Sequence, residues 1–324
     1  MGFSLGKGDA TVTGQFVDVA VLGATGFIGS RLCRRLTDAG LSVRAVARRL
    51  PASQGAVQPH LLPLDPGPGD WINAVDGARC VINLVGVAHF AGPDDEMIRG
   101  LFATNVVTTG TITQACARAS VERVVYLSSI KAIAESSSTP LASNGATAPT
   151  TTYGGTKLAG ELLTAAVVGE ECSATVVRVP MVYGVAARGN LGRIARGVKR
   201  GMPFPRLSHE GLRSIVSLER LVLALQELAD TERPPHVLHV CDPEPIVFSD
   251  IVSAIADGLG LPVRLVPLPT PFLSTALGAI GRRDTVQRWT HDLLMRSDQF
   301  EDHPPTSTRN GTLAELSAVA RTFG

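Results

Sequence analysis

A short apolar run followed at once by a glycine-rich turn opens the patterned part of this chain. Residues 17–22 read VDVAVL, and Gly23, Gly26 and Gly29 come directly before a segment with helical spacing. A continuous apolar run of this length is typical of a buried parallel strand, and such a strand needs a crossover, usually a helix, to reach its neighbour. The start of the chain therefore restricts it to a layered α/β fold.

The same alternation of strand and helix continues over the first 240 residues. Further runs with strand character cover residues 41–47, 80–85, 123–127, 173–179 and 237–241. Segments with helical spacing cover residues 29–39, 105–119, 154–168 and 218–229. This order predicts an α/β fold with a doubly wound parallel sheet that helices cover on both faces.

The pattern changes after about residue 184. A basic helix is predicted at residues 189–201, a loop at 203–208, a second helix at 248–259 and a proline-rich segment at 262–271. We expect these parts to form a smaller C-terminal lid that binds substrate on the carboxyl edge of the sheet. The predicted division is a flexible leader at 1–16, a dinucleotide-binding domain at 17–184 joined by 215–242, and a substrate-binding domain at 185–214 and 243–324.

Charge and cysteine content exclude several classes of function. Lys plus Arg is 30 and Asp plus Glu is 29, so no basic excess indicates nucleic acid or an anionic membrane as partner. The five cysteines are scattered without a CxxC pair or a Cys/His cluster, which indicates neither a disulfide framework nor a metal site. The start lacks the order of a signal peptide, and the apolar stretch at 271–280 is about half the length of a membrane span. We expect a cytoplasmic protein with no membrane insertion.

The glycine turn has the spacing of a dinucleotide-binding turn. Gly23 allows the tight turn, Gly26 lets the backbone approach a pyrophosphate, and Gly29 lets helix and strand pack closely. The start of the following helix supplies unpaired N–H groups and partial positive charge. The alternative is a purely structural turn. We expect the cofactor to contact Gly23, Thr25, Gly26, Phe27, Ile28 and Gly29.

The end of the second strand indicates which dinucleotide is bound. No Asp or Glu occurs between residues 41 and 64, whereas Arg48 and Arg49 end the strand. An acidic residue there would favour NAD, and guanidinium groups suit the 2′-phosphate of NADP. We predict NADP, with NAD as the alternative if the arginines are only solvated loop charges. Asp65 follows the next apolar run and is expected at the adenine amino group, unless it is simply a turn residue before Pro66.

Tyr153 and Lys157 form the second motif. Residues four apart lie on one face of a helix, so the ammonium can sit beside the phenol and lower its pKa toward neutrality. Ser129 ends the strand at 123–127, on the edge where α/β sheets bind ligands, and is predicted to hold a substrate oxygen with Ser128 beside it. A phenol, an ammonium and a hydroxyl in this arrangement predict proton transfer coupled to hydride transfer. The alternative for the tyrosine and lysine is a chance surface pair.

Together these motifs resemble the extended short-chain dehydrogenase/reductase family, in its nucleotide-sugar epimerase/dehydratase branch, which has a Rossmann-type fold. The likeness covers roughly residues 17–267. By resemblance, residues 80–86 form the strand that lines the nicotinamide, residues 105–110 form a helix start, and residues 178–184 bring backbone to the nicotinamide. The cofactor contacts that this implies are Leu84, Val85, Gly86, Asn105, Lys157 and Pro180.

A narrower likeness concerns the substrate. Residues 127–131, 189–191 and 201–205 are similar to bacterial UDP-sugar 4-epimerases and 4-keto-sugar reductases of surface-polysaccharide synthesis. By that likeness Asn190 would contact the sugar nucleotide and Arg213 its diphosphate. His89 follows the nicotinamide strand and is expected to face the sugar, unless it is a loop histidine without a role. Thr156 departs from the serine that is usual before the lysine, and the match fades after residue 267.

The sequence therefore predicts an NAD(P)-dependent nucleotide-sugar oxidoreductase that transfers hydride at C4 of a UDP-hexose. The sequence favours reduction of a 4-keto sugar. The arginines after the second strand suit NADPH, the usual cellular reductant, and a reductase must release its cofactor after each turnover. The alternatives are a UDP-hexose 4-epimerase, a reductase of unrelated ketones and a non-catalytic NAD(P)-binding subunit. By resemblance, the helix at 105–119 and the helix that bears Tyr153 would form the interface of a homodimer.

Overall fold

The computed structural model describes residues 15–49, 57–88, 94–167, 172–185, 190–270, 289–298 and 308–323. Most of the predicted leader, His89 and the apolar stretch at 271–280 lie outside the described residues. Asn190 is described only in its backbone.

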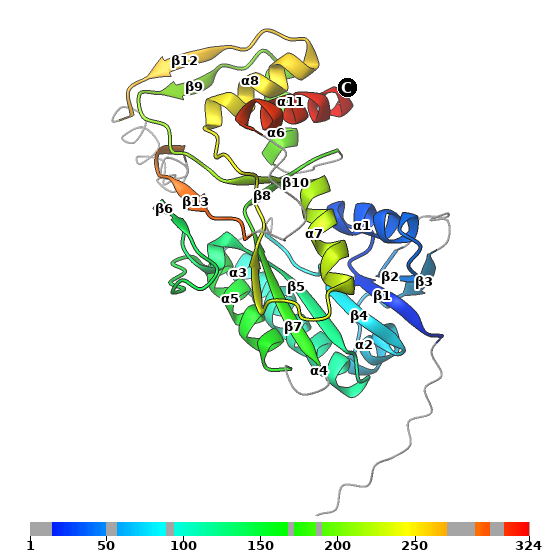
Figure 1. Ribbon diagram of the computed structural model, residues 1–324. Coiled ribbons are helices and arrows are strands. Elements are labelled where there is room, and N and C mark those ends of the chain that lie inside the picture. The colour runs from blue at the N-terminus through cyan, green and yellow to red at the C-terminus, as the bar shows by residue number, and fades with distance from the viewer. Residues whose placement is uncertain are drawn as a thin grey trace, which may run out of the picture.

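The centre of the protein is a seven-stranded sheet. Its strands are β1 (Val17–Leu22), β2 (Val43–Ala47), β3 (Gln58–Leu61), β4 (Ala78–Asn83), β5 (Arg123–Ser129), β7 (Ser173–Val179) and β11 (Val237–His239). They lie in the order β11-β7-β5-β4-β1-β2-β3, and every neighbouring pair is parallel (Figure 1). The predicted doubly wound parallel sheet is confirmed. Strand order reverses between β1 and β4, where a ligand crevice is expected at the carboxyl ends.

Helices cover both faces of this sheet because each carries one apolar stripe. Leu32 and Leu36 of one helix and Leu221, Leu225 and Leu228 of another are completely buried in one core cluster. A second cluster on the opposite face includes Trp71 and Ile112 of two other helices. The helices of the first face are α1 (Phe27–Asp38) and α7 (Leu218–Asp230), and those of the second face are α2 (Pro68–Val75), α4 (Thr109–Arg118) and α5 (Thr152–Ala165).

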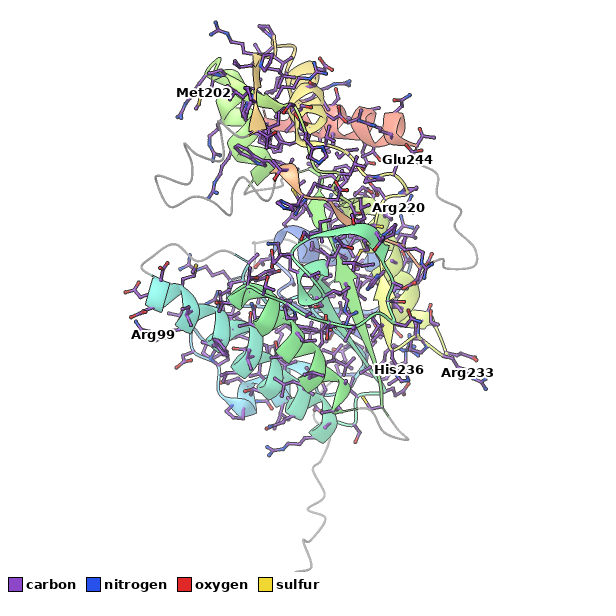
Figure 2. The ribbon with its side chains drawn as sticks, turned by 90° about the vertical axis from the view of Figure 1, so that its left-hand side faces the viewer. Arg99, Met202, Arg220, Arg233, His236 and Glu244 are labelled. Carbon is purple, nitrogen blue, oxygen red and sulfur yellow. The ribbon has the colours of Figure 1, made fainter. Side chains whose placement is uncertain are left out.

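A lid stands over the carboxyl end of the sheet (Figure 1). Its elements are the helices α6 (Asn190–Lys199), α8 (Phe248–Leu259) and α11 (Arg309–Ala320) and the strand pair β9 (Phe204–Leu207) and β12 (Leu265–Leu268). The chain enters it through β8 (Met181–Tyr183), which pairs with β10 (Ile215–Ser217). Figure 2 shows Met202 on the lid, at the opposite end of the molecule from Arg233 and His236.

The loop predicted at 203–208 is wrong. Phe204 pairs with Leu265 and Leu207 with Leu268, and Leu207 is buried. Two prolines in and before β9 hide the alternation by which a strand is normally found. The sequence also predicts no strand near residues 136–138, whereas β6 (Ser137–Leu141) pairs with the distant β13 (Leu293–Met295).

The lid has its own hydrophobic core. This third cluster includes Leu191, Val198, Ile251 and Leu316, which come from three helices that the sheet clusters do not use. The cluster supports the predicted division into two domains, which stays a prediction. Within the described residues, no helix is long and apolar enough to cross a bilayer.

Candidate active site

The glycine turn after β1 lies against the segment that follows β4. Gly23 has a φ of +81°, and a Cβ there would lie 3.4 Å from the carbonyl carbon of Leu84. A Cβ on Gly29 would lie 2.3 Å from the carbonyl oxygen of Gly23, which a real side chain cannot do. Both positions therefore require glycine, the first for its backbone conformation and the second for close packing.

The start of α1 fits the pyrophosphate of a dinucleotide. Gly26 precedes the helix and has an extended backbone. Because glycine has no side chain, none caps the helix, and no acidic residue occurs in the first turn. The first N–H groups and the positive end of the helix dipole are thus left for an anion. This site would hold the pyrophosphate with the backbone of residues 26–29, as the sequence predicts. Thr25 lies in the turn before the helix and Ile28 in the first turn of the helix.

The three residues predicted to contact the adenosine end lie on the surface. Arg48 and Arg49 directly follow β2 and are exposed, and within the described chain neither has a hydrogen bond or ion pair. Asp65 follows β3 and is exposed as well. The structure therefore leaves both guanidiniums at the strand end free to meet a phosphate.

A π-helical turn, η1 (Ala103–Thr108), places Asn105 under the predicted nicotinamide strand. Asn105 is completely buried, and its amide oxygen accepts a hydrogen bond from the Val87 N–H at 3.0 Å. Its amide nitrogen donates to the Val87 carbonyl at 3.0 Å and to the Thr156 hydroxyl at 3.1 Å. Local π-helical turns are frequent at functional sites. Here the turn ties the segment after β4 to the helix that bears Tyr153.

Gly86 brings the two motifs together. A Cβ at this position would lie 3.3 Å from the amide oxygen of Asn105 and 3.6 Å from the ammonium of Lys157. Gly86 is exposed, and Leu84 and Val85 before it are partly exposed. The residues predicted to line a nicotinamide are thus accessible to solvent.

Tyr153 lies in the first turn of α5. The Thr151 hydroxyl caps this helix by accepting from the Gly154 N–H at 3.2 Å. A Cβ on Gly154 would lie 2.3 Å from the Lys131 carbonyl oxygen, so this glycine lets α5 approach the turn after β5. Glycine is unfavourable in a helix, but at this position it is needed because a larger residue would collide with the turn after β5.

The phenol of Tyr153 lies near Ser129, the residue predicted to share its site. Burial raises the pKa of Tyr153, the Ser129 hydroxyl lowers it, and the charge of Glu135 raises it. The net direction is upward, opposite to the lowering predicted from the Tyr-x-x-x-Lys spacing. The reason is visible in the next contact, because the ammonium of Lys157 is directed elsewhere.

Lys157 is buried and donates to two oxygens of β5. Its Nζ lies 2.7 Å from the Tyr126 hydroxyl and 2.7 Å from the Leu127 carbonyl oxygen, and 4.1 Å from the centre of the Tyr126 ring. Burial lowers the pKa of Lys157 to about 7, and the charge of Glu161 opposes this change. The lysine is therefore poised to change charge near neutral pH.

Ser128 does not face the cleft. It is 3% exposed, and its hydroxyl donates to the Glu161 carboxylate at 2.5 Å. The substrate contact predicted for Ser128 does not fit this geometry, because alternate residues of a strand point to opposite faces and Ser128 points to α5. Tyr126 and Glu161 are the site residues that sequence reasoning missed. Glu161 could have been found, since it continues the spacing of Tyr153 and Lys157 by four residues.

The remaining predicted contacts are spread around the cleft. Pro180 is buried between β7 and β8. Arg213 pairs through its backbone with Ile246, and its guanidinium donates to the His291 carbonyl at 3.4 Å, so it lies at the base of the lid. Asn190 opens α6.

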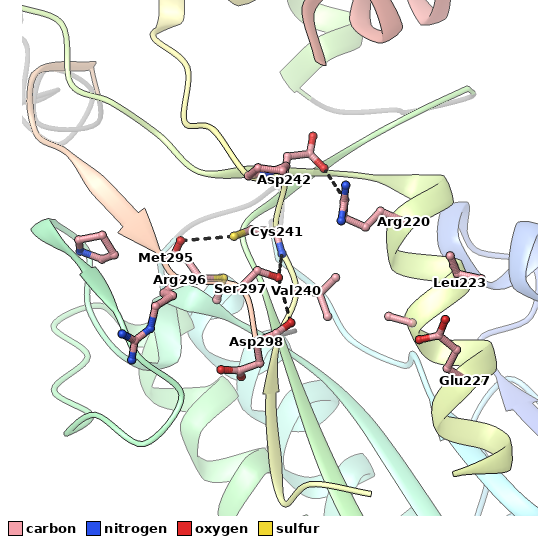
Figure 3. Close-up of a pocket in the computed structure, with 13 residues that line it drawn as sticks. Arg220, Leu223, Glu227, Val240, Cys241, Asp242, Met295, Arg296, Ser297 and Asp298 are labelled. Atoms are coloured by element: carbon pink, nitrogen blue, oxygen red, sulfur yellow. Dashed lines mark hydrogen bonds and ion pairs between the residues drawn. The ribbon is translucent and has the colours of Figure 1, made fainter. Parts of the chain in front are cut away.

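A separate pocket of about 350 Å³ lies between α7, the end of β11 and residues 295–298. Figure 3 shows Arg220 reaching from α7 to Asp242, where the guanidinium lies 3.2 Å from the carboxylate. None of the residues predicted for cofactor or catalysis lines this pocket. The chemistry predicted from sequence for Tyr153, Lys157 and Ser129 lies outside this pocket and stays a prediction.

The fold and the cleft can be compared with known proteins. The model of the NAD dependent epimerase/dehydratase family matches residues 19–214. The chain belongs to this family. The predicted family and its class of NAD(P)-dependent enzyme are thus confirmed.

The individual relatives have low sequence identity to this chain. A dTDP-6-deoxy-L-talose 4-dehydrogenase (NAD(P)(+)) from Kitasatospora kifunensis is 28% identical over 78% of the chain and 82% of the relative. A dihydroflavonol 4-reductase from Dianthus caryophyllus is 34% identical over 38% of the chain and 37% of the relative. The solved structure of MoeE5 in complex with UDP-glucuronic acid and NAD is 23% identical to this chain and has a TM-score of 0.72. The match covers 94% of this chain and 99% of MoeE5. That likeness supports the fold.

Proposed function

We propose that this protein reduces the 4-keto group of a UDP-hexose with NADPH, in the cytoplasmic synthesis of surface-polysaccharide precursors. One observation carries the proposal. Gly86, Asn105 and Lys157 converge at the carboxyl ends of β4 and β5, and Tyr153, with Ser129 near its phenol, lies one helical turn before Lys157. A cofactor laid from the glycine turn along residues 84–86 would end at this group.

The chain's own residues would divide the chemistry among them. NADPH, when bound, supplies the hydride to the carbonyl carbon. The Ser129 hydroxyl holds the carbonyl oxygen, and the Tyr153 hydroxyl gives that oxygen its proton, so that the ketone becomes a carbinol. The Lys157 ammonium, whose hydrogen bonds go to Tyr126 and Leu127, lies one helical turn from the phenol and would stabilise the remaining phenolate by its charge alone. Asn105 fixes the backbone of residue 87 and, through Thr156, the first turn of α5.

The choice of substrate rests on the relatives. The 4-dehydrogenase from Kitasatospora acts, by its name, on a nucleotide-linked deoxy sugar, and MoeE5 is seen with a UDP-sugar. The placement of Arg213 at the base of the lid suits a diphosphate.

A reductase of unrelated ketones is the second candidate, because the dihydroflavonol 4-reductase has the higher identity over the shorter match. A UDP-hexose 4-epimerase would use the same three side chains but would retain its cofactor. The exposed arginines after β2 favour the reductase, since NADPH is oxidised in each turnover and is released as NADP⁺.

The deciding experiment measures NADPH oxidation by the purified protein. A UDP-4-keto-hexose, a dihydroflavonol and a 3-ketosteroid are offered as substrates, and UDP binding is measured by calorimetry. We expect turnover only of the sugar, and loss of about 100-fold or more in kcat in Tyr153→Phe with cofactor affinity retained. Tyr183→Phe is a matched control, because that buried phenol bonds Asp242 on the lid side. Equal rates for Tyr153→Phe and the parent would refute the proposed site.

A further inference from the structure

A buried ion pair lies directly behind the proposed site. The Glu161 carboxylate accepts from Arg178 at 2.7, 3.0 and 3.2 Å, and the two side chains are 5% and 6% exposed. The same carboxylate accepts from the Ser128 hydroxyl at 2.5 Å, and Arg178 also donates to the Ser143 carbonyl at 3.3 Å. Every charge in this cluster is thus matched inside the protein.

The pair joins the three elements that carry the proposed chemistry. Glu161 is on α5, one helical turn after Lys157 and two turns after Tyr153. Ser128 is on β5 and immediately precedes Ser129, and Arg178 is on β7, two residues before Pro180. These elements lie side by side (Figure 1). Replacing a buried ion pair with apolar residues is often neutral or stabilising, so stability alone is a weak reason for this pair.

We propose that Glu161 is a positioning residue: anchored by Ser128 and Arg178, its carboxylate holds the charged end of Lys157 and the Ser128–Ser129 strand end in their working positions. This inference rests on the roles proposed above for Tyr153, Lys157 and Ser129. Glu161 touches neither the substrate nor the cofactor in this scheme. It acts through Lys157 by its charge and through Ser128 by a hydrogen bond.

The charges around Lys157 support this role. Tyr126 of β5 faces the ammonium directly, Tyr153 lies one turn before it on α5, and Glu161 is the anion that opposes the lowering of its pKa. Arg178 lies beyond Glu161, and His239 of β11 faces that arginine. The pKa of Lys157 is about 7 with burial lowering it and the Glu161 charge raising it, so loss of that charge would lower it further and leave most molecules with a neutral lysine at physiological pH.

The test follows the titration of Lys157 itself. The chain contains four lysines, Lys7, Lys131, Lys157 and Lys199, so NMR of protein labelled with ¹³C and ¹⁵N in lysine gives few signals. The Lys157 signal is assigned by its loss in Lys157→Arg. We expect Glu161→Gln to move its titration to lower pH by about one unit and Glu161→Asp, which keeps the charge, to restore most of the shift. Glu219→Gln removes an exposed carboxylate paired with Arg31 and should change nothing.

Kinetics then separates positioning from support of the fold. Activity should fall as pH rises through the pKa of Lys157, and Glu161→Gln should move this alkaline limb to lower pH. A merely structural role would lower kcat at every pH and leave the limb in place. If the single variant does not fold because Arg178 is left unpaired, Glu161→Gln/Arg178→Gln removes both charges and keeps the titration measurable.

The two proposals fail in different ways. Lys157 titrating at the parental pH in Glu161→Gln and in the double variant would overturn the role of Glu161, whatever the activity. A shifted titration in a protein that reduces none of the offered ketones would uphold the role of Glu161 and overturn the proposed reaction.

Discussion

The two arginines that end β2 make a prediction about cofactor choice at the level of single residues. Both are exposed and directed to no other described residue, so their charge is available to the 2′-phosphate that distinguishes NADPH from NADH. We expect Arg48→Gln/Arg49→Gln to weaken NADPH binding by about 100-fold, since each charge-assisted contact with phosphate is worth roughly 1.5 kcal/mol. NADH binding should stay within about twofold of the parent. Fluorescence titration with both cofactors measures this, and an equal loss for both would contradict the role of the arginines.

Lys157 should make the stability of the protein depend on pH. Its pKa is about 7 in the folded protein and 10.5 ordinarily, so between these values the unfolded chain binds one more proton. Stability therefore rises with pH through that window, and the penalty for charging the buried lysine is fully present below pH 7. We expect the Lys157→Met variant to lose reduction and to show no such rise in stability with pH. Urea unfolding at pH 7 and pH 9.5 measures the free energy of unfolding of parent and variant. A parent and variant with the same pH dependence would show that Lys157 keeps its proton throughout.

At the scale of elements, the contact between α5 and β5 depends on one glycine. A Cβ on Gly160 would lie 2.3 Å from the Tyr126 hydroxyl oxygen and 2.9 Å from the Asn105 carbonyl oxygen. We expect Gly160→Ala to destabilise the protein by about 1–3 kcal/mol and to lower kcat by moving the hydroxyl that receives Lys157. Tyr126→Phe/Gly160→Ala removes the crowded oxygen and should recover part of the stability but not the rate. A double variant no more stable than Gly160→Ala would place the strain elsewhere.

Regular elements with a continuous local pattern could be predicted from sequence, and elements made by distant pairing could not. The strands at Val17–Leu22 and Ser173–Val179 and the helix at Phe248–Leu259 have their predicted bounds. By contrast, β9 and β6 are short and owe their strand structure to partners more than 50 residues away, a contact that no local window contains. Intrinsic strand propensity therefore does not predict a strand where long-range pairing decides the structure.

The candidate site shows the same division. The glycine turn and the Tyr153–Lys157 spacing are local patterns with a mechanical meaning, so they could be read directly. The direction of a buried side chain depends on partners from other elements. The sequence therefore predicts a substrate contact for Ser128, whereas its hydroxyl bonds Glu161. For the same reason the sequence predicts a lowered pKa for Tyr153, whereas burial raises it.

At the scale of the whole molecule, the helical layer around α5 exposes several large apolar side chains. Val107 of η1 and Leu162 of α5 are each 66% exposed, and Ile98 and Phe102 of α3 (Asp94–Phe102) are exposed as well. The helices α3, η1 and α5 contact one another, so these side chains come from one connected layer. An exposed apolar patch of this kind is typical of a protein interface. We propose that the layer pairs with the same layer of a second copy around a twofold axis.

Removing this apolar surface should therefore separate the copies. We expect the parent to sediment with a mass of about twice 34.0 kDa and Val107→Glu/Leu162→Glu to sediment at 34.0 kDa, because four buried carboxylates without partners would oppose the contact. Met202→Glu is the matched control, since it places the same charge on an exposed apolar residue of the lid. Sedimentation at several protein concentrations measures the equilibrium. A parent that is monomeric throughout would contradict the interface, whereas dissociation by Met202→Glu alone would place the interface on the lid.

The helix α5 also carries Tyr153 and Lys157, so the double variant tests whether activity depends on assembly. Its kcat at high protein concentration shows whether the site needs the second copy.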